Sequence, residues 1–491
     1  MCLKFQMGPL RHLAVSVSCP ASLLARTAQL VQHINSLAEK GSGRTKVLLT
    51  VKPSIESQIS PDTLNLWTRV TSILYSGASP DIDLTIGLNT SPAAVTDHLD
   101  LSGQESGSND SKIDDTNNKI YSQVVLGGTF DRLHAGHKIL MTTALLRCTD
   151  RLTVGVTGQD MLKNKTLPEL ITPVQDRIEG VKEFVNQVRN DVQCNAVEIQ
   201  NPFGPAIELP ELECIVGSQE TEKGCLAINT KRKEAGMNEL DIHLIELVQD
   251  ESREQEFEEE KVSSSTGRIR LLGTRLAPPL QAWNKSAGPY VIGLTGGSAS
   301  GKSSVGKRMA GLGWGVVDCD KLGHLAYTPG QAAYNKIVEE FGEVVVTGDG
   351  NIDRRALGGI VFSDASKLKR LNEIVWPEIA RLAKERCHEL WAAGSGCQVV
   401  VLDAAVLLEA GWDAECHEVW VCVVPRQEAV KRIVERDGKT EEEAERRISS
   451  QLSNQDRVKK ANTVLCTLWD PKHTQGQVER AVHRLNDELK V

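Results

Sequence analysis

Residues 289–304 read PYVIGLTGGSASGKSS, and this stretch decides the fold of the second half of the chain. The part from Gly296 to Ser303 fits the pattern G-x-x-x-x-G-K-[ST], between an apolar run at 291–294 and a segment with helical spacing. Glycines let backbone N–H groups turn inward around phosphate oxygens, and the start of the following helix adds a partial positive charge. The sequence therefore predicts a strand, a phosphate-binding loop and a helix, in that order.

The residues of this loop have expected roles. Lys302 is expected to reach the β- and γ-phosphates of ATP, and the Ser303 hydroxyl is expected to bind Mg²⁺. The alternative is a Gly- and Ser-rich loop that matches by chance, but the flanking strand and helix argue against it. The predicted nucleotide-binding residues here are Gly296, Gly297, Ser298, Ala299, Ser300, Gly301, Lys302, Ser303 and Ser304.

Two carboxylates follow the next apolar run, in the stretch VVDCDKLG. Asp318 and Asp320 stand at the carboxyl end of an expected strand, the edge at which open α/β sheets bind their ligands. A carboxylate there can accept the proton of a substrate hydroxyl. The alternative is that Asp318 caps the following helix, and both interpretations can hold for the pair.

Two charged helical segments near the C-terminus suggest a lid. Arginines on a helical flap can close over a phosphate that is being transferred. The alternative is a pair of solvated charged helices. The arginines concerned are Arg432, Arg436, Arg446 and Arg447.

The first half of the chain holds a different element, LGGTFDRLHAGH at 126–137, between an expected strand and an expected helix. His134 and His137 are three residues apart, but no third ligand lies nearby, which argues against zinc. Imidazoles at a helix start can instead stabilise a pentavalent phosphate, and the glycines let a nucleotide approach the backbone. The element favours nucleotidyl transfer, with a structural histidine pair as the alternative.

Length and composition limit the number of domains and the class of protein. The chain has 491 residues, which suggests about three domains. The charge is −9, with 40% hydrophobic and 25% charged residues, so a wholly disordered or collagen-like chain is excluded and nucleic acid is not an expected partner. No run approaches the ~18 apolar residues of a membrane span. The 12 cysteines lack a CxxC pair, as in intracellular proteins with reduced thiols.

Strands alternating with helices predict an α/β fold with parallel sheets. The N-terminus, residues 1–46, is basic and poor in acidic residues, which fits either an organelle-targeting segment or an amphipathic helix at 22–38 that packs on its own domain. We therefore expect a cytoplasmic or mitochondrial protein, and peripheral membrane association through the N-terminus stays open. The oligomeric state is left open. The expected parts are an N-terminal region (1–100), a linker (101–119), a first catalytic domain (120–275), a linker (276–289) and a second catalytic domain (290–491).

The second domain resembles the dephospho-coenzyme A kinases over about residues 290–470. The resemblance implies a P-loop α/β kinase with a helical lid, in which Asp320 is the base and Arg447 a lid arginine that contacts phosphate. Thr467 stands where the family pattern has Asn. The resemblance is carried by IGLTGGSASGKSS, VVDCDKLGHLAYTPG, RRALGGIVF, NEIVWPEI, VLDAAVLLEAG and RIVERDG…AERRISSQ.

The first domain resembles the [TH]-x-G-H nucleotidyltransferases, a Rossmann-like fold, and among them phosphopantetheine adenylyltransferase. The stretches GGTFDRLHAGH, DMLKNKTLPEL, VGSQETEKG and VSSSTGR carry this resemblance. It implies that His137 and Lys163 are catalytic, with Lys165 as an alternative to Lys163. The nucleotide-binding residues that it implies are Gly128, Thr129, Phe130, His134, Arg177, Glu220, Ser264, Ser265 and Arg268.

Joined in this order, the two domains resemble the bifunctional coenzyme A synthases of animals. The resemblance implies adenylyl transfer from ATP to 4′-phosphopantetheine, and then phosphorylation of dephospho-CoA on its ribose 3′-hydroxyl. Two alternatives are weighed against it: a nicotinamide-nucleotide adenylyltransferase joined to a riboside kinase, and a scaffold in which one domain only binds nucleotide.

Overall fold

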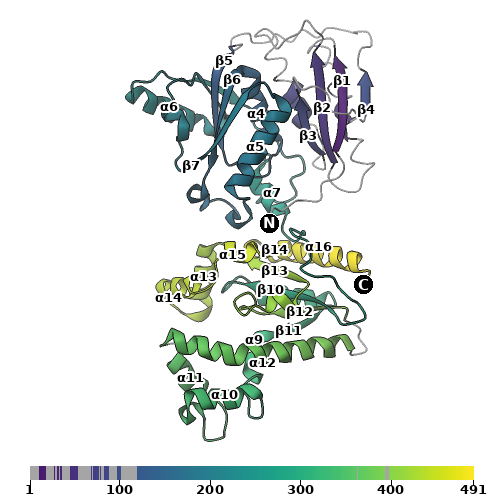
Figure 1. Ribbon diagram of the computed structural model, residues 1–491, viewed down its shortest axis with the longest axis vertical. Coiled ribbons are helices and arrows are strands. Elements are labelled where there is room, and N and C mark those ends of the chain that lie inside the picture. The colour runs from purple at the N-terminus through teal and green to yellow at the C-terminus, as the bar shows by residue number, and fades with distance from the viewer. Residues whose placement is uncertain are drawn as a thin grey trace. The chain divides into compact units, whose positions relative to one another are not determined.

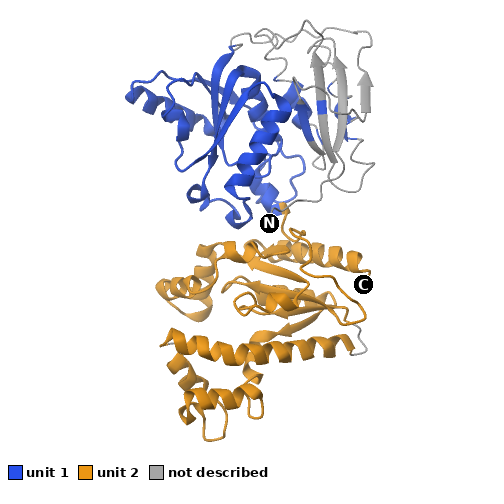
Figure 2. Ribbon diagram, viewed as in Figure 1, with its two compact units in different colours: residues 1–269 blue, residues 270–491 orange. Residues whose placement is uncertain are grey.

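The computed structural model describes residues 119–361, 363–392 and 397–491 and, in the first 118 residues, four strands and positions 27, 30–32, 34–35, 68, 70–76 and 78 (Figure 1). The chain forms two compact units, residues 1–269 and residues 270–491 (Figure 2). The predicted linker 101–119, except its last residue, lies outside the described residues. So do most of the N-terminal positions on which the targeting and membrane expectations rest.

The first unit is built around a five-stranded parallel sheet in the order β7-β6-β5-β8-β9. Strand β5 pairs with β6 on one side and with β8 on the other, so its carboxyl end is the switch point at which such sheets bind ligands. The strands are β5 (Tyr121–Gly128), β6 (Cys148–Thr157), β7 (Gln193–Ile199), β8 (Cys214–Ser218) and β9 (Asp241–Ile245). The helices are α4 (Ala135–Arg147), α5 (Val174–Val188), α6 (Glu222–Glu234) and α7 (Ser264–Arg270).

A second parallel sheet in the same unit comes from the N-terminal region, in the order β3-β2-β1-β4. Leu30 and Ile34 are buried in a core that also includes Val181 and Phe184 of α5, and the ring of Tyr75 lies 6.5 Å from that of Phe184. The N-terminal region therefore shares a core with the rest of the unit, as expected if the stretch 22–38 packs on its own domain. The strands are β1 (Leu10–Val17), β2 (Thr45–Pro53), β3 (Ile82–Gly87) and β4 (Asp97–Asp100).

The second unit has its own five-stranded parallel sheet, in the order β11-β12-β10-β13-β14. Strands β12 and β13 are buried at every position, which explains their nearly continuous apolar sequences. The predicted α/β architecture is thus confirmed in both units. The strands are β10 (Tyr290–Gly296), β11 (Gly315–Asp318), β12 (Val399–Asp403), β13 (Glu418–Val423) and β14 (Thr463–Cys466).

Helices cover both faces of this second sheet. Helix α8 packs with α16 on one face, and α9 packs with α12 on the other (Figure 1). Helices α13 and α14 form a charged pair beside the sheet, and α10 and α11 pack against α12. The bounds are α8 (Lys302–Gly311), α9 (Cys319–Leu325), α10 (Ala332–Phe341), α11 (Arg354–Val361), α12 (Ala365–Ala392), α13 (Arg426–Asp437), α14 (Glu441–Ser449), α15 (Asn454–Val458) and α16 (Pro471–Leu489).

The stretch 276–289, predicted to be a linker, packs on the second unit. The Leu276 N–H donates to the Asn462 carbonyl and the Leu280 N–H to the His417 carbonyl, each at 2.7 Å, and the Asn462 side chain donates to the Pro278 carbonyl at 2.6 Å. The two compact units divide after Ile269, whereas the boundaries predicted from the sequence lie at 275 and 289. The prolines of this stretch break regular structure, but its backbone groups still find partners on the unit.

None of the described helices is long and apolar enough to cross a membrane. Every cysteine in the described part of the chain is free, and most are buried.

Candidate active sites

The loop between β5 and α4 is held in an unusual conformation. Phe130 and Arg132 have φ angles of 51° and 50°, a region that residues other than glycine rarely adopt. The carboxylate of Asp131, between them, is fully buried, and it accepts hydrogen bonds from the backbone N–H and the hydroxyl of Thr172, both at 3.1 Å. It also pairs with Arg268 at 2.8 Å. Such strain persists because the surrounding contacts fix the loop, and it is typical of ligand-binding sites.

Two neutral imidazoles lie at the start of α4. His134 is the N-cap residue, and its ring stacks on that of His137 with the centroids 3.8 Å apart. Burial lowers the pKa of His134 to about 4, and burial with the neighbouring charge of His134 lowers that of His137 well below 6.5. The Nδ1 atoms of both rings are buried and have no hydrogen-bond partner among the described residues. Unpaired ring nitrogens at a helix N-terminus form a site suited to an anionic group.

Residues from distant parts of the sequence converge on this loop, as the sequence predicts. Arg177 donates to the Thr129 carbonyl at 2.7 Å, and the Ser264 hydroxyl donates to the Asp131 carbonyl at 2.8 Å. Arg177 and Arg268 are both buried, and their guanidinium groups hydrogen-bond to the protein. In this structure the two arginines therefore hold the loop in place, a contact that the sequence did not reveal.

Other predicted residues complete the surroundings of the histidines. The Thr129 hydroxyl lies 3.3 Å from that of Thr157 on β6, and the ring of Phe130 lies 5.2 Å from that of His137. A Cβ atom on Gly128 would lie 3.1 Å from the Phe130 ring, so glycine suits this close approach. The Ser265 hydroxyl accepts from Arg268 at 3.4 Å.

Two predicted residues of the first site make their contacts elsewhere. Lys163 has a side chain that is 73% exposed, and it pairs with Asp160 at 2.9 Å. Glu220 pairs with Lys261, whose charge in turn acts on the pKa of His134. Glu220 is thus linked to His134 through Lys261, whereas Lys163 lies on the surface.

The second site is the loop after β10. Ala299 and Gly301 have φ angles of 60° and 81°, and the Ser300 hydroxyl is buried with no hydrogen-bond partner among the described residues. A Cβ atom on Gly296 would lie 2.5 Å from the Ser300 hydroxyl and 2.6 Å from the Cys422 carbonyl, so only glycine fits there. The loop ends at α8, whose first residue is Lys302. The predicted strand, loop and helix are confirmed.

Lys302 lies between carboxylates. Its ammonium pairs with Asp403 and lies 3.6 Å from Asp320. Burial alone would lower the pKa of Lys302, but the charge and hydrogen bond of Asp403 outweigh it and raise that pKa. Asp318 caps α9 by accepting from the Lys321 N–H at 3.1 Å, so one Asp of the pair caps the helix while the other faces the lysine.

The charged helices α13 and α14 touch the phosphate-binding loop. Arg447 donates to the Ser298 hydroxyl at 3.1 Å and pairs with Asp437 at 2.9 Å. Its neighbour Arg446 instead donates to the Glu442 carbonyl of its own helix at 3.4 Å. The Ser298 N–H donates to the side chain of Gln451 at 2.9 Å. In the predicted role of the loop, this N–H would face a phosphate.

Thr467 joins the lid to the loop. Its hydroxyl donates to the Ser300 carbonyl at 2.9 Å and accepts from Arg432 at 2.8 Å. Arg432 also donates to the Thr467 carbonyl at 2.7 Å and to the Ala299 carbonyl at 3.2 Å. These contacts bring Arg432 and Arg447 to the loop, whereas Arg436 pairs with Asp437.

Comparison with known proteins identifies both regions. A family model described as dephospho-CoA kinase matches residues 290–467, and one described as cytidylyltransferase-like matches residues 125–270. A dephospho-CoA kinase from Geobacter sulfurreducens is 42% identical over 189 residues, which cover 38% of this chain and 95% of that protein. The chain belongs to the dephospho-CoA kinase family.

A second curated relative of the kinase unit agrees. A dephospho-CoA kinase from Carboxydothermus hydrogenoformans is 39% identical over 188 residues, covering 38% of this chain and 90% of that protein. The solved structure of the dephospho-CoA kinase from Campylobacter jejuni has 22% identity and a TM-score of 0.33, and covers 40% of this chain and 98% of that chain. A cytidylyltransferase-like domain followed by a dephospho-CoA kinase domain matches the order of a bifunctional CoA synthase.

The sequence analysis assigned no role to Asp403 in the kinase unit. It ends β12, in register with Leu294 of β10 and with Asp318 of β11, so it lies at the carboxyl edge of the sheet. Burial raises the pKa of its carboxyl, and the Lys302 charge only partly offsets this. The stretch QVVVLDA, in which a lone carboxylate follows an apolar strand, is the signal that could have identified it.

Proposed function

We propose that this chain catalyses two successive reactions with ATP. In the first unit 4′-phosphopantetheine receives an adenylyl group, giving dephospho-CoA and pyrophosphate. In the second unit the dephospho-CoA ribose 3′-hydroxyl receives the γ-phosphoryl group, giving CoA and ADP. The observation that carries the proposal is the order of the two domains, a cytidylyltransferase-like domain followed by a dephospho-CoA kinase domain.

In the first site a phosphate oxygen of 4′-phosphopantetheine attacks the α-phosphorus of ATP, and pyrophosphate leaves without an enzyme-bound intermediate. His134 would bind a phosphate of ATP and His137 would stabilise the pentavalent transition state, both from the N-terminus of α4. Lys163 would join them on binding, since only an exposed ion pair with Asp160 holds it. Positioning and electrostatics then supply the catalysis.

In the second site the 3′-hydroxyl of dephospho-CoA attacks the γ-phosphorus of ATP. Asp320 would orient this hydroxyl and accept its proton. Lys302 would offset charge on the phosphates, and Arg447 would contact them from the lid. Asp320 is suited to this role because its side chain is 60% exposed while it lies 3.6 Å from Lys302.

The kinase site also fits Mg²⁺, which prefers oxygen ligands and keeps several waters. The Ser303 hydroxyl lies in the first turn of α8, and the carboxylates of Asp320 and Asp403 lie beside Lys302. When bound, the ion would neutralise charge on the phosphates of ATP. Few protein ligands are needed, because Mg²⁺ keeps several of its waters.

The direct test is to incubate the full-length protein with 4′-phosphopantetheine and Mg-ATP and to follow the products by mass spectrometry. We expect dephospho-CoA first and CoA second. The same assay with nicotinamide mononucleotide in place of 4′-phosphopantetheine tests the alternative pairing. Product from the nicotinamide substrate alone would contradict the proposal for the first unit, and dephospho-CoA without CoA would contradict it for the second.

Two substitutions should separate the activities. His137→Ala removes a ring that lies at the start of α4, so we expect loss of adenylyl transfer with the kinase reaction unchanged. Lys302→Ala removes the loop ammonium, so we expect the reverse. Each half is assayed with its own substrate, after circular dichroism shows that the variant is folded. Loss of both activities from either change would contradict two independent sites.

A further inference from the structure

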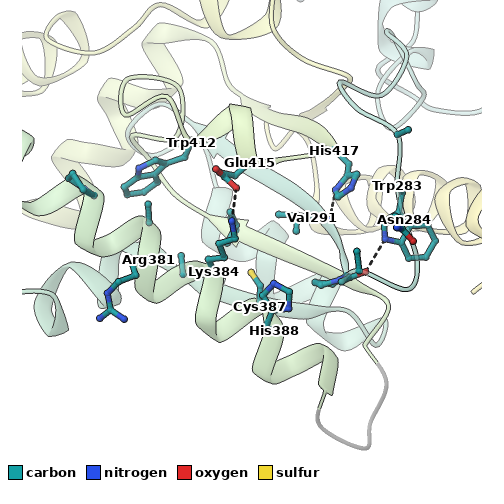
Figure 3. A pocket seen from close by; sticks show the side chains of 18 residues that line it. Trp283, Asn284, Val291, Arg381, Lys384, Cys387, His388, Trp412, Glu415 and His417 are labelled. Carbon is teal, nitrogen blue, oxygen red and sulfur yellow. Dashed lines mark hydrogen bonds and ion pairs between the residues drawn. The ribbon is translucent and has the colours of Figure 1, made fainter.

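The kinase unit contains a second cavity, away from the phosphate-binding loop. It has a volume of about 530 Å³ and lies between helix α12, the stretch 282–289 and the loop at 412–417 (Figure 3). Val291, which lines it, is near the amino end of β10, whereas Gly296 of the phosphate-binding loop ends that strand. At ~3.3 Å per residue these two positions are about 16 Å apart. None of the residues that line the cavity belongs to the phosphate-binding loop at 296–304, so the cavity is distinct from that loop.

The lining of the cavity is mostly apolar and partly aromatic. Trp283 and Trp412 contribute indole rings (Figure 3). Ala380 and Ala383 of α12 line the cavity with small side chains. The Trp283 indole N–H is already satisfied by the Gly288 carbonyl at 3.1 Å. The Lys285 ammonium lies 5.9 Å from the centroid of the Trp283 ring, and the Tyr290 ring packs against it at 5.7 Å. What the two indoles still offer a ligand is flat apolar surface, which favours a flat aromatic partner. The volume is in the range of sites for small organic molecules, ~300–1,000 Å³.

The charges at the mouth of the cavity are already paired. Arg381 binds Glu378 at 2.6 Å and Glu385 at 2.5 Å, and Lys384 lies 3.5 Å from Glu415. An anionic ligand would have to compete with these carboxylates, and a cationic one would meet the paired arginine and lysine. The pairing favours a ligand without net charge.

Two elements that line the cavity, α12 and β12, also lie next to residues of the kinase site. Cys387 lines the cavity from α12, which packs against α9, and α9 begins at Cys319, immediately before Asp320. Leu402 also lines the cavity, and the next residue on β12 is Asp403, which pairs with Lys302. A ligand that moves α12 or β12 would therefore move the groups around Lys302.

We propose that this cavity binds an uncharged aromatic small molecule, and that the bound molecule changes the rate of the kinase reaction. The first half of the proposal, the binding of the molecule, rests on the cavity alone. The second half rests on the kinase activity proposed above, and the two are tested by separate measurements.

Binding is tested on the full-length protein with prodan, an uncharged naphthalene dye whose emission shifts to the blue in apolar surroundings. We expect one saturable site. Ala380→Trp fills the cavity and should lower the affinity for the dye by at least about tenfold. Lys384→Trp, at the exposed mouth, should weaken binding as well and covers the case in which the first variant fails to fold. Ala392→Trp, exposed at the end of α12, is the matched control and should bind like the wild type.

Three results would overturn the binding half: no saturable site, equal loss in Ala392→Trp, or stoichiometric displacement of the dye by ATP. The second half is tested by measuring the kinase rate with dephospho-CoA and ATP at saturating dye. We expect a change of about threefold or more in the wild type and none in Ala380→Trp. An unchanged rate with the dye bound would refute the coupling while leaving the site in place. A protein with no kinase activity would instead contradict the proposed function.

Discussion

Asp403 and Lys302 form a buried ion pair at the phosphate-binding loop, and the charge of each offsets the free-energy cost of burying the other. Removing one charge of such a pair leaves the other buried without a partner. The Asp403 carboxylate is also one of the oxygens proposed above to hold Mg²⁺. We infer that this aspartate positions the lysine in addition to stabilising the fold.

Asp403→Asn is expected to lower kcat of the kinase reaction by at least about tenfold, because the Lys302 ammonium loses its charged partner. Adenylyl transfer, assayed with its own substrate, should be unchanged. Asp413→Asn is the control, since that carboxylate makes only a surface pair with Lys460 at 3.3 Å. Equal activities of the two variants would show that Asp403 has no role beyond packing.

Residue patterns predicted the local structure of the phosphate-binding loop well and the long-range contacts poorly. Lys302 and Ser303 could be assigned because the loop pattern is contiguous in sequence. Asp403 could not be paired with Lys302, since 101 residues separate them and only the register of the strands brings them together. The sequence likewise implied phosphate contacts for Arg268, but could not show that its guanidinium is already bound to the buried Asp131.

At the scale of elements, the helix pair α13–α14 is defined by local signals. Thr440 and Glu443 form a capping box at the start of α14, and Gly438 ends α13 in a left-handed conformation with φ of 63°. Sequence analysis could therefore locate the two helices. It could not decide which arginines face the loop, because that depends on how the pair packs.

Arg447→Ala is expected to raise KM for ATP and lower kcat of the kinase reaction, together by about tenfold or more in kcat/KM, because the lid loses its contact with the loop at Ser298. Arg446→Ala is the neighbouring control, because that side chain contacts its own helix. Steady-state kinetics at varied ATP distinguish the two. Similar effects in both variants would favour the alternative of a solvated charged helix pair.

At the scale of the whole molecule, the first unit depends on a buried histidine at the amino end of its sheet. His243 accepts a hydrogen bond from Arg147 at 3.2 Å on Nδ1, and its Nε2 atom lies 3.0 Å from the Tyr121 hydroxyl. Burial and the nearby charge of Arg147 lower the pKa of His243 to about 4. Arg147 also donates to the Thr68 hydroxyl at 3.3 Å, so this cluster ties the N-terminal region to the main sheet.

The stability of the first unit is therefore expected to fall as the pH drops from about 6.5 toward 4. The unfolded chain binds a proton at His243 in this window while the folded chain does not, so His243 alone lowers the stability of the folded state by up to about 3 kcal/mol. His134 and His137, whose pKa values burial also lowers, add to the same trend. Urea unfolding of the full-length protein at pH 7.5 and pH 5 measures this. His243→Gln should reduce the pH dependence, and His483→Gln, an exposed position on α16, should not. Identical pH dependence in both variants would contradict this assignment.

The stretch 270–289 has a practical consequence for dissecting the chain. The dephospho-CoA kinase match begins at residue 290, so sequence similarity alone would place the start of a kinase fragment there. Such a fragment would lack the backbone groups that bind Asn462 and His417, and it would remove one wall of the second cavity. A fragment that begins at Arg270 keeps both, so the starting residue alone decides whether an isolated kinase can be used to study control of the enzyme by small molecules.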